Sequence, residues 1–145
     1  MTVGGENWFI HTGSGSDALA AAGGRNVLDS GTGSNFLTGA SGEDTFFLDA
    51  RGASEAIWST VVVFGHGDAV TVWGTSSQDA GVAWLDDLGA AGYRGLTMQV
   101  TAPGKPNVLV TLAGYSRADL DSGLLQVSVG ASDPFSPYMH ILGAA

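Results

Sequence analysis

Residues 15–46 read GSDALAAAGGRNVLDSGTGSNFLTGASGEDTF, and one phrase of five residues occurs four times in this stretch. The phrase is a glycine, any residue, Asp or Asn, any residue, and Leu or Phe. Its copies begin at a constant interval of nine residues, at Gly15, Gly24, Gly33 and Gly42, and a slipped fifth copy begins at Gly5. This repeat decides the architecture of the first third of the chain.

A period of nine is too long for a helical face and too short for a pair of helices. The expected unit is one short strand and one tight turn, stacked on its neighbours. The Leu or Phe then points into a narrow interior, and the glycine supplies a positive φ in the turn. The Asp or Asn offers an oxygen to the turn above or below it. A single unit buries almost nothing, so the units stabilise one another.

The repeat resembles the RTX, or haemolysin-type calcium-binding, repeat, whose nonapeptide is Gly-Gly-x-Gly-x-Asp-x-apolar-x. The resemblance implies a short parallel β-roll over residues 1–49. It also implies that turn carbonyls and Asp side chains of successive rungs hold calcium. The matching positions in this chain are Asp17, Asn26, Asn35 and Asp44. Because several of the paired glycines are replaced, the roll is a degenerate one.

Two of the four matching positions carry no charge, and this leaves two interpretations open. Calcium takes six to eight oxygen ligands and accepts neutral ones, but its affinity rises with the number of carboxylates. We therefore expect weak sites, at or beyond the weak end of the range of roughly 10⁻⁴ to 10⁻³ M that extracellular modules use. In the alternative interpretation, Asn26 and Asn35 form an uncharged hydrogen-bonding ladder that holds the turns together without metal.

The resemblance extends to the end of the array. RTX arrays commonly end with Asp-Thr-Phe and then a strand of the type Asp-Phe-x-x-Gly-Asp-x-apolar. Residues 44–46 read DTF and residues 64–70 read FGHGDAV, so Asp68 is a fifth candidate calcium ligand. The acidic residue that the family has before this Phe is replaced by Val63.

Composition excludes several classes of function. The chain has 145 residues, a net charge of −9 and only five Lys plus Arg, which argues against nucleic acid as a partner. It has no cysteine, so disulfides and a thiol nucleophile are excluded. No apolar run approaches the length of a transmembrane helix. A charged segment followed by an apolar one, the pattern of an N-terminal leader, is not recognised in the first residues, as the resemblance would lead us to expect. The resemblance implies a secreted, extracellular bacterial protein that leaves the cell by type I secretion.

Beyond Asp49 the period of nine stops, and we interpret residues 50–145 as a second, β-rich cap subdomain. The runs 61–64 and 70–73, joined by turn residues 65–68, predict a hairpin. Residues 116–120 predict one helical turn capped by Ser116, and residues 102–107 predict a turn. Further strands are expected at 82–85, 96–101, 108–112, 124–129 and 138–142.

The predicted fold class is therefore all-β, with a short parallel β-roll (β-solenoid) followed by an antiparallel β-rich cap. The cap seals the open end of the roll, whose unpaired edge strands would otherwise favour self-association.

No catalytic constellation is visible in the sequence. His11, His66 and His140 share no metal-ligand spacing, and no serine lies in a Gly-x-Ser-x-Gly elbow. The adjacent acids Asp86 and Asp87, and likewise Glu43 and Asp44, are interpreted as solvated loop residues. We therefore expect no enzyme, and a small hydrolase domain is the least favoured function.

The four tryptophans support a different alternative, a carbohydrate-binding or adhesive module that stacks polysaccharide on aromatic rings. The competing interpretation is structural: Trp73 and Trp84 pack in the core, and Trp58 covers the junction of roll and cap. On balance the sequence predicts a non-catalytic calcium-binding module that extracellular calcium folds or stabilises. Such a module serves the secretion or scaffolding of a larger extracellular protein.

Overall fold

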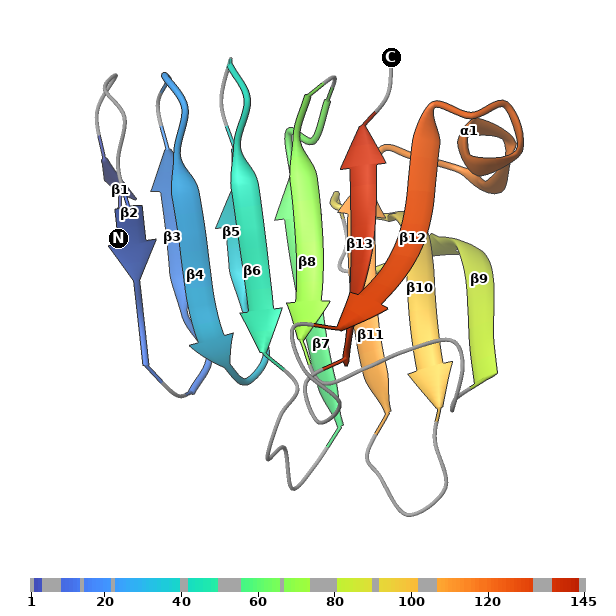
Figure 1. Cartoon of the computed structure of the whole chain (residues 1–145), viewed down its shortest axis with the longest axis horizontal. Coiled ribbons are helices and arrows are strands. Elements are labelled where there is room, and N and C mark those ends of the chain that lie inside the picture. The colour runs from blue at the N-terminus through green and yellow to red at the C-terminus, as the bar shows by residue number, and fades with distance from the viewer. Residues whose placement is uncertain are drawn as a thin grey trace.

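The computed structural model of the chain consists mainly of β-strands in two mixed sheets (Figure 1). It describes residues 2–3, 9–13, 15–21, 23–39, 42–49, 56–65, 67–73, 81–89, 92–101, 107–131 and 137–143. Within these residues there is one short helix, α1 (Arg117–Asp121). The prediction of an all-β chain is confirmed at this level.

Strands of the two sheets alternate along the first half of the chain. The first sheet contains, in spatial order, β1 (Thr2–Val3), β3 (Ala18–Ala21), β5 (Phe36–Thr38), β7 (Ile57–Val62), β11 (Val108–Ala113), β10 (Gly95–Thr101) and β9 (Gly81–Leu88). The second sheet contains, in spatial order from β2, the strands β2 (Phe9–His11), β4 (Val27–Thr32), β6 (Thr45–Asp49), β8 (Ala69–Trp73), β13 (Pro137–Gly143) and β12 (Leu125–Ala131).

Each of the four regular copies of the repeat contributes one strand, and consecutive copies lie in opposite sheets (Figure 1). Copies that are 18 residues apart therefore lie side by side in the same sheet and pair in parallel. Leu19 is opposite Leu37 in the first sheet, and Leu28 is opposite Phe46 in the second. These four side chains are at most 1% exposed. The apolar position of the repeat thus stacks on itself in each sheet and fills the space between the sheets.

Both parallel ladders continue for one strand beyond the repeat. β7 pairs in parallel with β5, and β8 pairs in parallel with β6. The predicted hairpin of residues 61–64 and 70–73 is therefore wrong, because β7 and β8 lie in different sheets. The reason is burial: Val61 stacks on Leu37, and Val70 stacks on Phe46, so each run is buried against the repeat.

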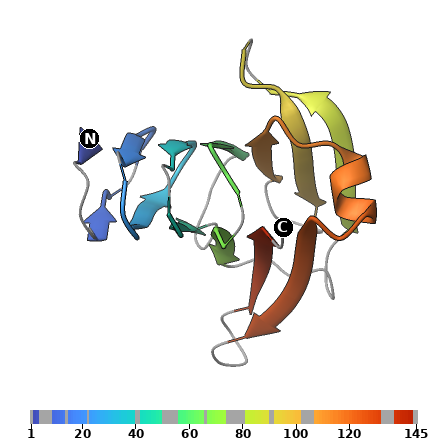
Figure 2. The same cartoon turned by 90° about the horizontal axis from the view of Figure 1, so that it is seen from above.

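The remaining strands pair mostly antiparallel. β9 and β11 flank β10, and β12 and β8 flank β13, all antiparallel, whereas β11 joins β7 in parallel. The five further strands and the helical turn after Ser116 are confirmed. The turn expected at 102–107 lies outside the described residues except for Asn107. Seen from above, the two sheets diverge toward β9 and β12, with α1 at the far end (Figure 2).

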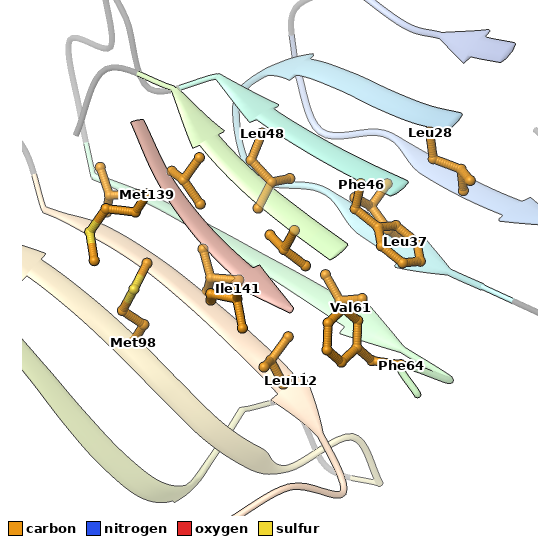
Figure 3. Close-up of a cluster of buried hydrophobic side chains, with 14 of the residues drawn as sticks. Leu28, Leu37, Phe46, Leu48, Val61, Phe64, Met98, Leu112, Met139 and Ile141 are labelled. Carbon is orange, nitrogen blue, oxygen red and sulfur yellow. The ribbon is translucent and has the colours of Figure 1, made fainter. Parts of the chain in front are cut away.

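One continuous hydrophobic core runs between the sheets, from Ile10 to Ile141 (Figure 3). Leu37 and Phe46 of the repeat are followed by Val61 and Phe64, and then by residues of the C-terminal strands such as Met98. The division of the chain at residues 1–49 and 50–145 remains a prediction. No helix in the described part of the chain is long and apolar enough to cross a membrane.

Candidate functional site

The five predicted site residues lie in turns, each directly before a strand. Asp17 and Asn35 precede β3 and β5 of the first sheet. Asn26, Asp44 and Asp68 precede β4, β6 and β8 of the second sheet. The structure therefore divides the predicted residues between two rows, one for each sheet.

The first row is a chain of hydrogen bonds from backbone to side chain. The N–H of Asp17 donates to Oδ1 of Asn35 over 2.8 Å, and the N–H of Asn35 donates to Oγ of Ser59 over 3.2 Å. We call Asp17, Asn35 and Ser59 the first ladder. Ser59 was missed from the sequence because it is neither Asp nor Asn and lies beyond the last copy of the repeat. Aligning Val61 with Leu37 would have identified it.

Asn26, Asp44 and Asp68 form an equivalent second ladder. The N–H of Asn26 donates to Oδ1 of Asp44 over 3.1 Å, and the side-chain amide of Asn26 donates to the same oxygen over 2.8 Å. The N–H of Asp44 donates to Oδ1 of Asp68 over 2.7 Å. Oδ2 of Asp68 accepts a further bond from the N–H of Gly65 over 2.8 Å.

These bonds satisfy turn N–H groups that would otherwise be buried without a partner. The hydrogen bonds of the ladder interpretation are therefore present for both Asn26 and Asn35. Whether metal also binds these turns stays a prediction.

Most members of the ladders are removed from water. Asn26, Asn35, Asp44 and Asp68 are 2%, 4%, 0% and 2% exposed. Burial raises the pKa of the Asp68 carboxyl above its usual value, and the nearby acids Asp44 and Glu43 act in the same direction. The hydrogen bonds from the backbone of Asp44 and Gly65 oppose this shift. A buried acid beside other acids is a site where a cation would relieve the electrostatic cost.

Asp17 begins the first ladder. Its Oδ2 atom is buried, and among the described residues it is the one buried side-chain polar atom without a hydrogen-bond partner. An unpaired buried oxygen costs about 1–3 kcal/mol. This atom is available to a cation or to a donor.

The turn glycines let successive turns approach closely. Gly33 and Gly42 have φ values of +108° and +115°. A Cβ at Gly33 would overlap the carbonyl oxygen of Gly15, and a Cβ at Gly42 would overlap that of Gly24. The positive φ expected for the repeat glycines is confirmed.

The carboxylate and amide oxygens of the ladders are the kind of ligand that calcium prefers. Among the described residues, however, no group of three or more His, Cys, Asp or Glu is placed to hold a metal ion. A calcium ion held by the ladders would therefore need backbone carbonyls or Asn oxygens in addition to Asp17, Asp44 or Asp68.

The described histidines lie apart on the outer face of the second sheet. His11 contacts Asp29 over 3.0 Å, and His140 contacts Thr71 over 3.1 Å. Their strands are separated by three others in the sheet order, so at about 4.8 Å per strand the two rings are about 19 Å apart. The two rings therefore cannot bind the same metal ion. His66 lies outside the described residues.

The tryptophans are on different surfaces. Trp84 packs against the core as expected, whereas Trp73 lies on the outer face of β8, because Val70 and Val72 occupy the inner face. Trp58 lies on the outer face of β7, where its ring donates to Thr111 of β11, so it covers the junction between repeat and C-terminal strands. Trp8 lies outside the described residues.

The interpretation of the adjacent acids as solvated loop residues is wrong in two respects: Asp86 and Asp87 lie in strand β9, and Asp44, the neighbour of Glu43, is buried. Asp86 and Asp87 have separate partners. Oδ1 of Asp86 accepts the N–H of Arg117 over 2.6 Å at the start of α1, and Asp87 lies 3.7 Å from the guanidinium of Arg94. Both are exposed.

The sequence matches no protein-family model, and no curated protein is significantly similar to it.

Proposed function

We propose that the chain is a non-catalytic, calcium-binding module of the RTX type, secreted by a bacterium as part of a larger extracellular protein. In this proposal residues 1–49 form a degenerate parallel β-roll and residues 50–145 form its β-rich cap. The repeat with its period of nine supports it. The parallel pairing of alternate copies supports the roll as well, and both parallel ladders continue past residue 49 into β7 and β8 of the region assigned to the cap.

One observation carries the calcium part of the proposal: Asp44 and Asp68 are buried in consecutive turns of the same ladder. Two carboxylates in this arrangement repel each other, and burial raises the pKa of Asp68. A calcium ion supplies two positive charges at this point. Asp44 and Asp68 would hold it, with turn carbonyls completing the ligand set.

The same carboxylates suggest how calcium controls folding. At the low calcium concentration of a cytosol, the repulsion between Asp44 and Asp68 loosens the turns, which keeps the chain suitable for export. Outside the cell, millimolar calcium neutralises this repulsion and orders the turns, because binding to the folded state adds to the free energy of folding.

Titration calorimetry with calcium tests the proposal directly. The unmodified protein should bind calcium with a Kd on the order of 10⁻⁴ to 10⁻³ M. Asp44→Asn and Asp68→Asn should each weaken binding, whereas Asp121→Asn, a change of an exposed acid on α1, should leave it intact. If no binding is detected up to about 10 mM calcium, well above the expected range, or if all three variants behave alike, these turns are not the calcium site.

A further inference from the structure

The outer face of the first sheet differs in charge from the rest of the molecule. The chain has five Lys plus Arg and 14 Asp plus Glu. By the alternation of side chains along strands, the regularly paired, described part of this face carries none of them. Its residues are Ala18, Ala20, Phe36, Thr38, Trp58, Thr60, Val62, Ala83, Leu85, Thr97, Gln99, Thr101, Leu109, Thr111 and Ala113. The outer face of the second sheet, in contrast, carries Asp29, Asp49, His11 and His140.

Trp58 is held on this uncharged face in one orientation. Its side chain is 41% exposed, and its ring nitrogen donates a 2.7 Å hydrogen bond to Oγ1 of Thr111. That oxygen also contacts Oγ1 of Thr97 at 2.7 Å, and both threonines are fully buried. The indole is therefore fixed by a buried polar pair while much of its surface faces water.

A second exposed ring lies on the same face. Tyr93 is 43% exposed, and its ring packs edge-on against Phe36, with 4.9 Å between centroids and 79° between planes. Phe36 is opposite Thr60, which in turn is opposite Thr111, the partner of the Trp58 ring. Phe36, Trp58 and Tyr93 thus border the same part of the sheet, and we call them the aromatic platform.

We propose that the aromatic platform binds an uncharged polysaccharide. A pyranose ring presents a face of C–H groups, which is attracted to the electron-rich face of an aromatic ring. A ring that is already held, as Trp58 is by its hydrogen bond to Thr111, loses little conformational entropy when a ligand stacks on it. Polar side chains on the same face suit the hydroxyl groups of a sugar. Examples are Ser34, whose Oγ accepts the N–H of Trp58, and Gln99, which lies two strands away from Trp58.

The charges of the molecule favour this partner over a charged one. A phosphorylated or sulfated ligand would meet no basic residue on the regularly paired, described part of this face. Arg94, next to Tyr93, already contacts the carboxylate of Asp87. A protein of net charge −9 would also repel such a ligand. The inference does not depend on calcium and goes beyond the proposed calcium-binding function.

Affinity electrophoresis in native gels tests the proposal. The probes are hydroxyethylcellulose, laminarin and galactomannan, with dextran sulfate as the charged control. At least one neutral polysaccharide should retard the protein, and dextran sulfate should not. Trp58→Ala and Tyr93→Ala should each weaken the binding about tenfold or more. Phe9→Ala should retain it, because Phe9 is an aromatic residue that is 67% exposed on the other sheet.

Three outcomes would overturn the proposal. The first is that none of the neutral polysaccharides retards the protein. The second is that retardation survives both platform substitutions, measured on variants whose circular dichroism matches that of the parent; Trp58→Phe replaces Trp58→Ala if the latter does not fold. The third is a dimer in sedimentation velocity that Trp58→Ala abolishes, because a second copy would then occupy the platform.

Discussion

The backbone N–H of Asp44 donates a 2.7 Å hydrogen bond to Oδ1 of Asp68, although both residues are acids and both are almost completely buried. The bond satisfies a turn N–H that water cannot reach. It also brings the side chain of one acid to the turn that carries the other. The ladder therefore stabilises the stacked turns through its hydrogen bonds and destabilises them through its charges.

Acidification should stabilise the calcium-free protein through Asp68. The pKa of this carboxyl is raised above 3.8, so between 3.8 and the raised pKa the folded state holds a proton that the unfolded state has lost. The contribution of Asp68 to the free energy of unfolding then increases as pH falls through this window and is lost as pH rises through it.

Urea unfolding in chelator at a series of pH values measures this contribution. The difference in unfolding free energy between the parent and Asp68→Asn should change with pH in this window. The difference between the parent and Asp121→Asn should change less. The prediction would be contradicted if the difference in unfolding free energy between the parent and Asp68→Asn did not depend on pH.

Substitutions of two serines compare the contribution of a buried hydrogen bond with that of an exposed one. Oγ of Ser59 accepts the buried N–H of Asn35, and Oγ of Ser34 accepts the exposed N–H of Trp58. Ser59→Ala should lower the free energy of unfolding by about 1–3 kcal/mol, because a buried donor loses its partner. Ser34→Ala should cost about 0.5 kcal/mol or less, since water replaces the hydroxyl. Equal losses in urea unfolding would count against the ladder as a stabilising element.

Substitutions of two glycines distinguish the energetic cost of disturbing the stacked turns from the cost of backbone strain. Gly33 and Gly114 both have positive φ, but a Cβ at Gly33 would overlap Gly15, whereas a Cβ at Gly114 has open space. Gly114→Ala should cost about 1–2 kcal/mol from the left-handed conformation alone. Gly33→Ala should cost clearly more in a thermal or urea melt. A smaller loss at Gly33 would show that the turns do not stack as closely as described.

The inner face of the repeat should behave as a true core. Leu37 is fully buried between the sheets, and Thr38 next to it points outward. Leu37→Ala should lower the free energy of unfolding by about 2–5 kcal/mol, and Thr38→Ala should cost about 0.5 kcal/mol or less. A loss at Leu37 below about 1 kcal/mol, measured by urea unfolding, would be incompatible with this packing.

The sequence predicted the elements of the fold better than their pairing. The period of nine located the turn residues, and β-branched runs located the later strands. Neither signal revealed that β7 and β8 continue the two parallel ladders. The number of residues along the chain from one strand to its parallel partner increases after β5 and β6, where the period of nine ends. Which strands pair depends on burial against residues far away in sequence, such as Val61 on Leu37.

The candidate sites show the same division. Asp44 and Asp68 were recognised because they fit a motif, and the structure adds that they are consecutive members of one buried ladder. Ser59 fits no motif, and its role follows only from register. The tryptophans suggested stacking of a polysaccharide from the sequence, but not that Trp58 lies on the same part of a sheet as Phe36 and Tyr93, because these rings come from segments that only the fold brings together.

A thermal melt followed by circular dichroism, in excess chelator and across a calcium titration to about 10 mM, tests the central claim most directly. The account predicts that calcium raises the midpoint and the β signal of the parent, and that Asp68→Asn greatly reduces the rise in midpoint. If the curves of the parent superimpose with and without calcium, the ladders are a metal-free scaffold and the calcium-binding function is contradicted.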